Sequence, residues 1–240
     1  MGDNEKSHFN AIAGKYHETA KSWETLYVQT RQLLNPIVTG KRVADVGNGG
    51  VFVFDPGLTK KTTCLDIAES MLAQIQDDRV EKIVTDARSM DGIADESVDA
   101  IVFNFSLHHI NGSNVRESLQ TLEDVISASN RKLVRGGKLI IGEPVFNRLM
   151  FTLQSLLFPV TKLILATFGV SMIYQFSQTV ILEKLARCLL CRPESVMVHE
   201  LEIRNSFDPL GGSFPGTIKI PGWFYPGRFL VFIATKPEAD

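Results

Sequence analysis

The stretch that decides the fold is Val43-Ala44-Asp45-Val46-Gly47-Asn48-Gly49-Gly50, in which an apolar run passes directly into a glycine-rich turn. Glycines at such a turn allow tight backbone dihedrals and let N–H groups approach a ligand closely. A second apolar run ends at Asp66, 19 residues after Gly47. A carboxylate at about this distance from a glycine turn is placed to accept hydrogen bonds from both hydroxyls of an adenosine ribose. The stretch therefore predicts a nucleoside site that includes Asp66.

Short apolar runs alternate with helical stretches around this turn. The alternation predicts a parallel sheet with right-handed crossovers, and the continuous character of the runs is typical of strands covered on both faces. Apolar residues on one face predict a long helix over residues 113–134. We expect strands at residues 42–46, 62–65, 82–85, 98–104 and 138–142, and two further strands at 200–204 and 228–235 that pair antiparallel at the sheet edge.

We expect a single domain of four parts. Residues 1–35 form a helical lid that ends at Pro36, 36–145 the cofactor-binding core, 146–192 an apolar helical insert that caps the substrate, and 193–240 the strands that complete the sheet. The insert contains the strongly apolar residues 149–174, with Lys162 as their only charge. Although 26 such residues could span a bilayer, Lys162 would cost about 2.5–3.5 kcal/mol there, and Pro159 and Gly169 break the run. We therefore favour two or three helices over the open end of the sheet, and membrane contact is not favoured.

The composition excludes several classes of protein. Of the 240 residues, 44% are hydrophobic and 22% charged, which argues against disorder and against a coiled coil. A net charge of −2 lacks the basic footprint of a nucleic-acid-binding protein. Three cysteines are too few for a disulfide framework, so we expect a reducing, cytoplasmic location. Cys188 and Cys191 have CxxC spacing, but no second pair follows, so we predict no metal site.

Six motifs stand in order within residues 8–145. They are HFNAIAGKY (8–16), DVGNG (45–49), DIAESML (66–72), DA (86–87), VDAIVFNFSLHH (98–109) and LVRGGKL (133–139). In this order and spacing they resemble the class I S-adenosylmethionine-dependent methyltransferases, of the small-molecule kind that includes the ubiquinone and menaquinone methyltransferases. The resemblance implies a Rossmann-like, doubly wound α/β fold with a seven-stranded, mostly parallel sheet and an antiparallel edge strand.

The resemblance also implies S-adenosyl-L-methionine as the cofactor and a set of residues that hold it. Asp66 would bind the ribose, Asn104 would lie near the sulfonium, and Tyr16 would close over the cofactor. The methionine part would be held by Asp45, Gly47, Asn48 and Gly49, and the adenine by Ile67, Met71, Asp86 and Ala87. Two departures concern the methionine end: Val51 stands where the family usually has a third glycine, and Phe54-Asp55-Pro56-Gly57 interrupts the expected helix.

Methyl transfer from a sulfonium is a direct displacement, so the protein mainly supplies orientation and a dry site. A base is needed only for an acceptor that is still protonated. Candidates at the ends of the fourth and fifth strands are His108, His109 and Glu143, with Tyr16 on the N-terminal segment. Either histidine could instead be a structural cap, and Glu143 a solvated turn carboxylate. The insert could wall an apolar acceptor pocket with Met150, Leu156, Leu157, Phe158 and Met172.

We expect a methyltransferase for an apolar or aromatic small molecule, a secondary metabolite or a quinone-like compound, in a monomer or homodimer. Two alternatives stay open: a protein that binds the cofactor but catalyses a rearrangement or cyclisation, and a membrane-associated methyltransferase for a lipid quinone. Nicotinamide binding fits the sequence less well, because residues 66–72 match the methyltransferase pattern better.

Overall fold

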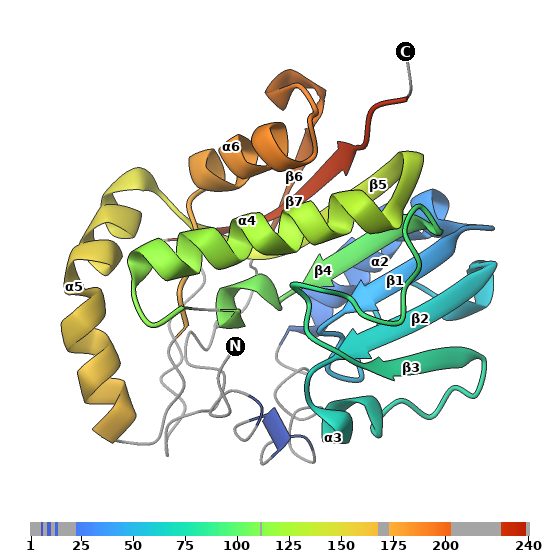
Figure 1. Ribbon diagram of the computed structural model, residues 1–240, viewed down its shortest axis with the longest axis horizontal. Coiled ribbons are helices and arrows are strands. Elements are labelled where there is room, and N and C mark those ends of the chain that lie inside the picture. The colour runs from blue at the N-terminus through green and yellow to red at the C-terminus, as the bar shows by residue number, and fades with distance from the viewer. Residues whose placement is uncertain are drawn as a thin grey trace.

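The computed structural model describes residues 6, 9, 10, 13, 23–110, 112–167, 173–202 and 227–238. Within them, seven strands form one sheet in the order β3-β2-β1-β4-β5-β7-β6 (Figure 1). Strands β1 to β5 are parallel where they are neighbours, and β7 is antiparallel to both β5 and β6. This confirms the expected Rossmann-like sheet. The bounds are β1 Arg42–Val46, β2 Lys61–Asp66, β3 Val80–Val84, β4 Val98–Asn104, β5 Leu133–Phe146, β6 Met197–Leu201 and β7 Gly227–Thr235.

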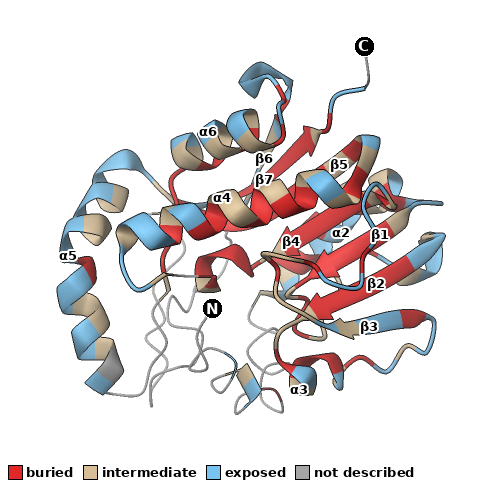
Figure 2. Ribbon diagram, viewed as in Figure 1, coloured by how far each residue is buried: buried red, intermediate tan, exposed pale blue. Residues whose placement is uncertain are grey.

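Helices cover both faces of the sheet. Helices α4 (Val115–Lys132) and α6 (Gln178–Cys188) lie on one face, and α2 (Glu24–Val38) on the other (Figure 1). Alternate residues of one strand face the two sides: Ala44 of β1 joins the core beneath α4 and α6, and its neighbour Val43 joins the core beneath α2. Both faces are therefore dry, as the buried strands in Figure 2 show, and this explains why the strand sequences are continuous apolar runs.

Several predicted boundaries are wrong by a few residues. Strand β3 begins at Val80, earlier than predicted, because it is an edge strand with only one buried residue and thus a weak apolar signal. Helix α2 continues through Pro36 to Val38, because Leu34 and Val38 are both fully buried and their packing holds the last turn together. Strand β5 is longer at both ends than predicted, and β6 lies earlier. The antiparallel pairing of β6 with β7 is as predicted.

The apolar insert differs more from its prediction. A single helix, α5 (Arg148–Thr167), runs through Pro159 without a break, where a break was predicted. It lies at the margin of the molecule, beyond the N-terminal end of α4 (Figure 1), and is not a buried cap. Of residues 148–165 only Phe158 is buried. Among the described residues, this is the one helix long and apolar enough to cross a membrane. Gly169 and Met172 lie outside the described residues, and the four-part domain division stays a prediction.

Candidate active site

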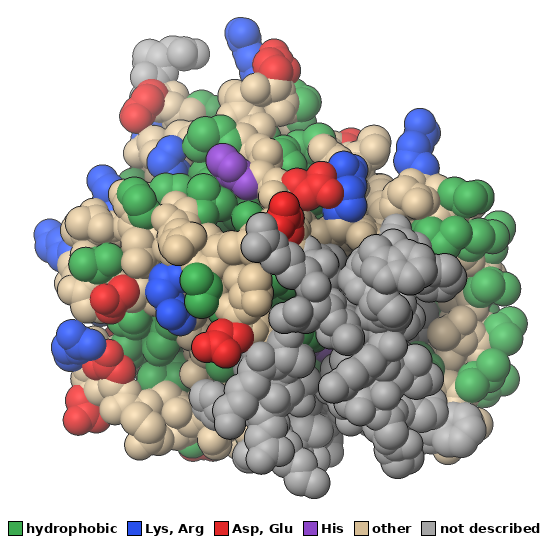
Figure 3. Space-filling model, turned by 180° about the vertical axis from the view of Figure 1, so that it is seen from behind, with side chains coloured by type: hydrophobic (Ala, Val, Ile, Leu, Met, Phe, Trp, Pro, Cys, Tyr) green, Lys and Arg blue, Asp and Glu red, His purple; other side chains and the backbone are tan. Residues whose placement is uncertain are grey.

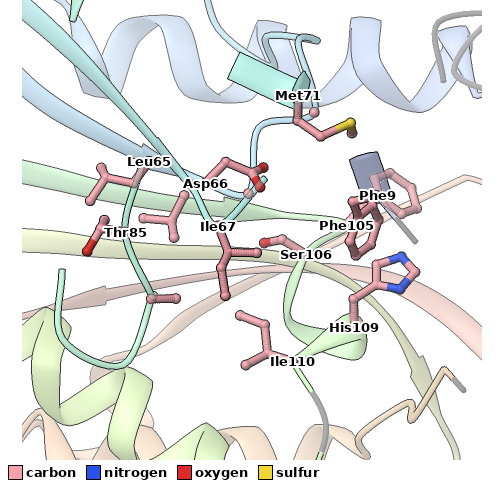
Figure 4. Close-up of a pocket in the computed structure, with 14 residues that line it drawn as sticks. Phe9, Leu65, Asp66, Ile67, Met71, Thr85, Phe105, Ser106, His109 and Ile110 are labelled. Atoms are coloured by element: carbon pink, nitrogen blue, oxygen red, sulfur yellow. The ribbon is translucent and has the colours of Figure 1, made fainter. Parts of the chain in front are cut away.

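A pocket lies at the carboxyl ends of the central parallel strands (Figure 4). The strand order places the ends of β2, β1 and β4 side by side, so residues distant in sequence meet here. Figure 4 shows Phe9, Phe105 and His109 together at one end of the pocket and Leu65 and Thr85 at the other. The lining residues are Phe9, Val46, Gly47, Gly49, Leu65, Asp66, Ile67, Met71, Thr85, Ala87, Phe105, Ser106, His109 and Ile110.

Asp66 is the acidic residue in this lining, and it stands at the last position of β2. Its Oδ1 accepts a hydrogen bond of 2.9 Å from the backbone N–H of Ala68. Burial raises the pKa of the carboxyl group to about 6, although backbone hydrogen bonds from Ala68 and Ile67 act in the opposite direction. The group is therefore mainly ionised at pH 7, and a carboxylate has acceptor capacity beyond these bonds. The structure thus places Asp66 where a ligand's hydroxyl groups could reach it.

Asp45 and Asn48, both predicted to hold the methionine part, are absent from the pocket lining. Asp45 is buried and accepts a hydrogen bond of 2.6 Å from Asn48 Nδ2. Asn48 also donates to the carbonyl of Val51 and accepts from the N–H of Gly50. Burial raises the pKa of Asp45 to about 7, against the lowering effect of the Asn48 bond. These two side chains stabilise the glycine turn through hydrogen bonds on the side away from the pocket. On the other side, Gly47 and Gly49 expose their backbone to the pocket.

The α-helix expected after the turn is absent between β1 and β2. The chain forms one 3-10 turn there, Pro56–Leu58, whose Asp55 cap accepts a hydrogen bond of 2.8 Å from the N–H of Gly57. This confirms the prediction that the sequence at residues 54–57 shortens or removes that helix. The methionine end of the site therefore has no α-helical N-terminus after the glycine turn.

Gly47 and Ser106 bring the ends of β1 and β4 into close contact. Gly47 has φ +70°, and a Cβ there would lie 2.6 Å from the Cβ of Ser106, so a larger residue does not fit. The Ser106 Oγ is buried and makes no hydrogen bond to any residue that the structure describes. Because buried hydroxyls normally find a partner, an orphaned one in a pocket wall suits a polar ligand.

Phe105 produces the sharp turn at the end of β4. It is one of the non-glycine residues with positive φ, at +52°, a conformation that is strained for a bulky side chain. Its N–H donates to the carbonyl of Gly142 at 2.9 Å. Its ring stacks on Trp23 at 4.3 Å between centroids and packs on Phe229 at 4.6 Å. These contacts hold a turn that brings the following residues, Ser106 to Ile110, to the pocket.

The predicted catalytic residues separate into two groups. His109 lines the pocket, whereas His108 and Glu143 are buried behind it. Nδ1 of His108 lies 2.6 Å from Oε2 of Glu143. The other oxygen of Glu143 accepts from the N–H groups of Ser106 and Leu107, at 2.8 and 2.7 Å. Glu143 is therefore a support for the turn and not a solvated carboxylate.

Of the remaining residues predicted to bind the cofactor, some line the pocket and others do not. Ile67, Met71 and Ala87, which were predicted to contact the adenine, line the pocket. Asp86 does not line it, because its carboxylate is held by the Arg88 guanidinium at 2.6 Å. The Asn104 Oδ1 is buried and has no hydrogen-bond partner among the described residues, but Asn104 is not part of the lining. Tyr16 lies outside the described residues.

Sequence reasoning missed Phe9, Thr85, Phe105, Ser106 and Ile110 as lining residues. Phe9 contacts His109 edge-on at 5.0 Å and packs with Ala68 and Met71, so the N-terminal segment reaches the pocket. The position of Phe9 within the first motif, HFNAIAGKY, was the sequence signal that could have indicated its place at the pocket. The position of Ser106 depends on the backbone of Phe105, which no sequence pattern indicates.

The lining fits an adenosine-containing group. It offers a half-buried carboxylate for hydroxyl groups, the apolar side chains of Ile67, Met71 and Ala87 for a flat ring, and the orphaned Ser106 hydroxyl. All three cysteines are free thiols, and no cluster of metal-ligating side chains occurs among the described residues.

Comparisons with known proteins agree with this geometry. Residues 44–141 match the family model described as "Methyltransferase domain". A chain of the complex between the Haloferax volcanii Trm112 methyltransferase activator and a methyltransferase shares the fold, with a TM-score of 0.63 and 15% identity over 96% of this chain and 98% of that one. A comparison of the sequence with curated proteins gives no match.

Two further structures with the same fold contain S-adenosylhomocysteine. One is the Burkholderia thailandensis 1,6-didemethyltoxoflavin-N1-methyltransferase, with a TM-score of 0.57 and 16% identity over 97% of this chain and 87% of that one. The other is the N-methyltransferase NodS of Bradyrhizobium japonicum, with a TM-score of 0.56 and 13% identity over 90% and 88%. Over residues 44–141 the chain is therefore similar to a methyltransferase domain, and its fold is the Rossmann-like fold of the S-adenosylmethionine-dependent methyltransferases.

Proposed function

We propose that this protein transfers the methyl group of S-adenosylmethionine to an apolar or aromatic small molecule, of secondary-metabolite or quinone-like kind, in the cytoplasm. The observation that carries the proposal is the half-buried Asp66 carboxylate at the end of β2, beside the glycine turn in a pocket with apolar walls. The methyltransferase domain match over residues 44–141 supports the same reading. So do the two neighbours of the same fold whose structures contain the demethylated cofactor.

Different pocket residues would bind different parts of the cofactor. Asp66 would accept hydrogen bonds from the ribose hydroxyls, and Ile67, Met71 and Ala87 would pack against the adenine. The turn at Gly47 and Gly49 would face the methionine part with its backbone, because its side-chain partners Asp45 and Asn48 point away into the core.

The bound cofactor supplies a methyl group that the sulfonium has already activated. The protein's part is to orient the acceptor and to exclude water, and Phe9, Phe105 and Ile110 give the wall near His109 an apolar surface. An imidazole takes up a proton near neutral pH, so His109 is suited to accept the proton of a phenol or ammonium acceptor. Glu143 acts through the turn: it fixes Ser106 and Leu107, which precede the two histidines.

Calorimetry with S-adenosylhomocysteine tests the cofactor site. We expect wild type to bind and Asp66→Asn to bind at least tenfold more weakly, because an amide offers one oxygen acceptor where a carboxylate offers two. Asp124→Asn is the matched control, since Asp124 is an acidic residue on the surface of α4 and outside the pocket. Equal affinity of wild type and Asp66→Asn would contradict the proposal.

A second function with the same fold keeps the cofactor but does not transfer its methyl group, as in a rearrangement or cyclisation. The observation that favours it is the altered methionine end, with Val51 after the glycines and a 3-10 turn in place of the α-helix. Incubation with methyl-labelled cofactor and a panel of phenols, amines and quinols separates the two functions. Label in the product supports methyl transfer, and turnover without label supports the alternative.

A further inference from the structure

Helix α5 carries a long apolar surface that no other described part of the protein covers. We define the α5 stripe as its outward side chains, whose exposed fractions run from 42% at Leu153 to 72% at Leu156. Seen from behind, this surface forms a hydrophobic margin of the molecule (Figure 3). The members of the stripe are Leu149, Leu153, Leu156, Leu157, Val160, Leu163 and Ile164.

Two threonine hydroxyls and one lysine ammonium near the α5 stripe are held within the protein. Thr152 and Thr167, which also face outward, donate their hydroxyls to the carbonyls of Arg148 and Ile164 in the same helix, at 2.8 and 2.6 Å. Lys162 turns inward: its Nζ lies 3.3 Å from the carbonyl of Gly112 and 5.7 Å from the ring centroid of Phe158. The stripe therefore offers a partner apolar surface and almost nothing to hydrogen-bond.

The inner face of α5 is fastened to the protein. Gln154 and Gln175 exchange two hydrogen bonds, of 2.9 and 3.2 Å, and the Ser155 hydroxyl lies 2.8 Å from that of Tyr174. Tyr174 in turn donates its N–H to the carbonyl of His108 at 3.0 Å, one residue from the pocket wall. With one face held in this way, α5 cannot be surrounded by lipid as a spanning helix is. Only the outer face of α5 can therefore enter a lipid phase.

The charge of the surrounding segment favours an anionic surface. Residues 144–182 contain no Asp or Glu, although the chain has 27 such residues in total. The charged side chains of this segment are Arg148 and Lys162, both basic, of which Arg148 is exposed and Lys162 turns inward. Anionic lipid headgroups attract basic groups, whereas acidic groups would be repelled.

We propose that α5 is an in-plane membrane contact, whose stripe enters the boundary between the headgroups and acyl chains of an anionic bilayer. Hydrocarbon accepts apolar side chains that make no hydrogen bonds, and buried apolar area drives such interfacial binding. A protein partner would use a polar rim and about one hydrogen bond per 100–200 Å² of interface, which this stripe does not provide. The inference goes beyond the proposed function and does not depend on it.

Vesicle flotation of the full-length protein tests the proposal. The vesicles contain phosphatidylcholine and phosphatidylglycerol, and the variant is the double substitution Leu156→Glu and Leu163→Glu. We expect wild type to float with the vesicles and the variant to partition at least tenfold less, because two carboxylates then meet the bilayer. The matched control is Leu190→Glu, which lies after α6 and is 72% exposed, as Leu156 is. It should float as wild type does.

Three outcomes would overturn the proposal: wild type stays in the soluble fraction, the double variant floats like wild type, or the control loses binding equally. A fourth concerns a second copy of the chain. If light scattering without vesicles shows a wild-type dimer and a monomeric double variant, the stripe is a dimer interface instead. Circular dichroism melting of all three proteins shows that the substitutions leave the fold intact, since the changed side chains are exposed.

Discussion

Two carboxylates, Asp45 and Asp66, stand on neighbouring strands at the same edge of the sheet and have different surroundings. Both are raised in pKa by burial, to about 7 and about 6. Asp66 opens on the pocket, whereas Asp45 is enclosed and meets the side chain of Asn48. Both were predicted to hold the cofactor, because the sequence indicates which residues stand at the strand ends but not how each side chain is oriented there.

The buried Asp45 predicts a pH dependence of stability. In the unfolded chain its carboxyl ionises near pH 4, but in the folded protein only near pH 7, so the folded state holds the extra proton between these values. The free energy of unfolding should therefore fall as pH rises from 4 to 7, by up to about 4 kcal/mol from this group. In Asp45→Asn this part of the decline should disappear. Urea unfolding at pH 4.5 and 8 measures it, and an equally steep decline in the variant would refute the assignment.

Gly47 predicts a steric effect at the turn. Gly47→Ala introduces a Cβ 2.6 Å from that of Ser106 as well as strain at φ +70°. We expect a loss of about 1–3 kcal/mol in the free energy of unfolding and at least tenfold weaker binding of S-adenosylhomocysteine. Gly40→Ala is the matched control, because Gly40 has the same φ and open space around its position. If both variants lose the same free energy, the contact with Ser106 has no role.

At the scale of elements, the 3-10 turn Leu107–His109 links the core to the pocket. Strand β5 supplies Glu143 beneath it, so one buried carboxylate serves Ser106, Leu107 and His108 at once. These hydrogen bonds are buried and shielded from water, so removal of the carboxylate would leave the donors without partners. The free-energy cost of unpaired buried donors is larger than the net contribution of the hydrogen bonds.

Glu143→Ala should therefore lower the free energy of unfolding by about 2–5 kcal/mol and weaken binding at the pocket. Glu143→Gln keeps an oxygen for the two N–H groups and should recover part of that loss. Thermal unfolding and calorimetry with S-adenosylhomocysteine compare the two variants. A Glu143→Ala protein as stable as wild type would mean that the turn does not need this support.

The elements differed in how well the sequence predicted them, for physical reasons. Strands β1 and β4 have the predicted bounds. Both lie inside the sheet and are buried along nearly their whole length, so the apolar run in the sequence coincides with the strand. Strand β3 is an edge strand and was misplaced by two residues. The break at Pro159 was wrong because a proline removes one hydrogen bond of a helix, and α5 tolerates the loss at an exposed site. The positions of Phe105 and Ser106 depend on contacts with β5 and β7, which local sequence does not contain.

At the scale of the whole molecule, the pocket draws on four strand ends and on the N-terminal segment around Phe9. Binding should therefore stabilise the fold as a unit. At a concentration of S-adenosylhomocysteine one hundred times its Kd, linkage gives about 2.7 kcal/mol, and we expect Tm to rise by about 5–10 °C. Differential scanning fluorimetry measures the shift. Asp66→Asn should show a smaller one, and an unchanged Tm in wild type would count against binding.

The position of β7 has a consequence for biosynthesis. It is the last of the seven strands to leave the ribosome, yet it inserts between β5 and β6 and is buried from Phe229 to Ala234. Until it emerges, the nascent chain presents the bare hydrogen-bonding side of β5, and unpaired strand edges promote aggregation. The sheet can be completed only after β7 has emerged, so a chaperone that shields β5 until then should raise the yield of native protein.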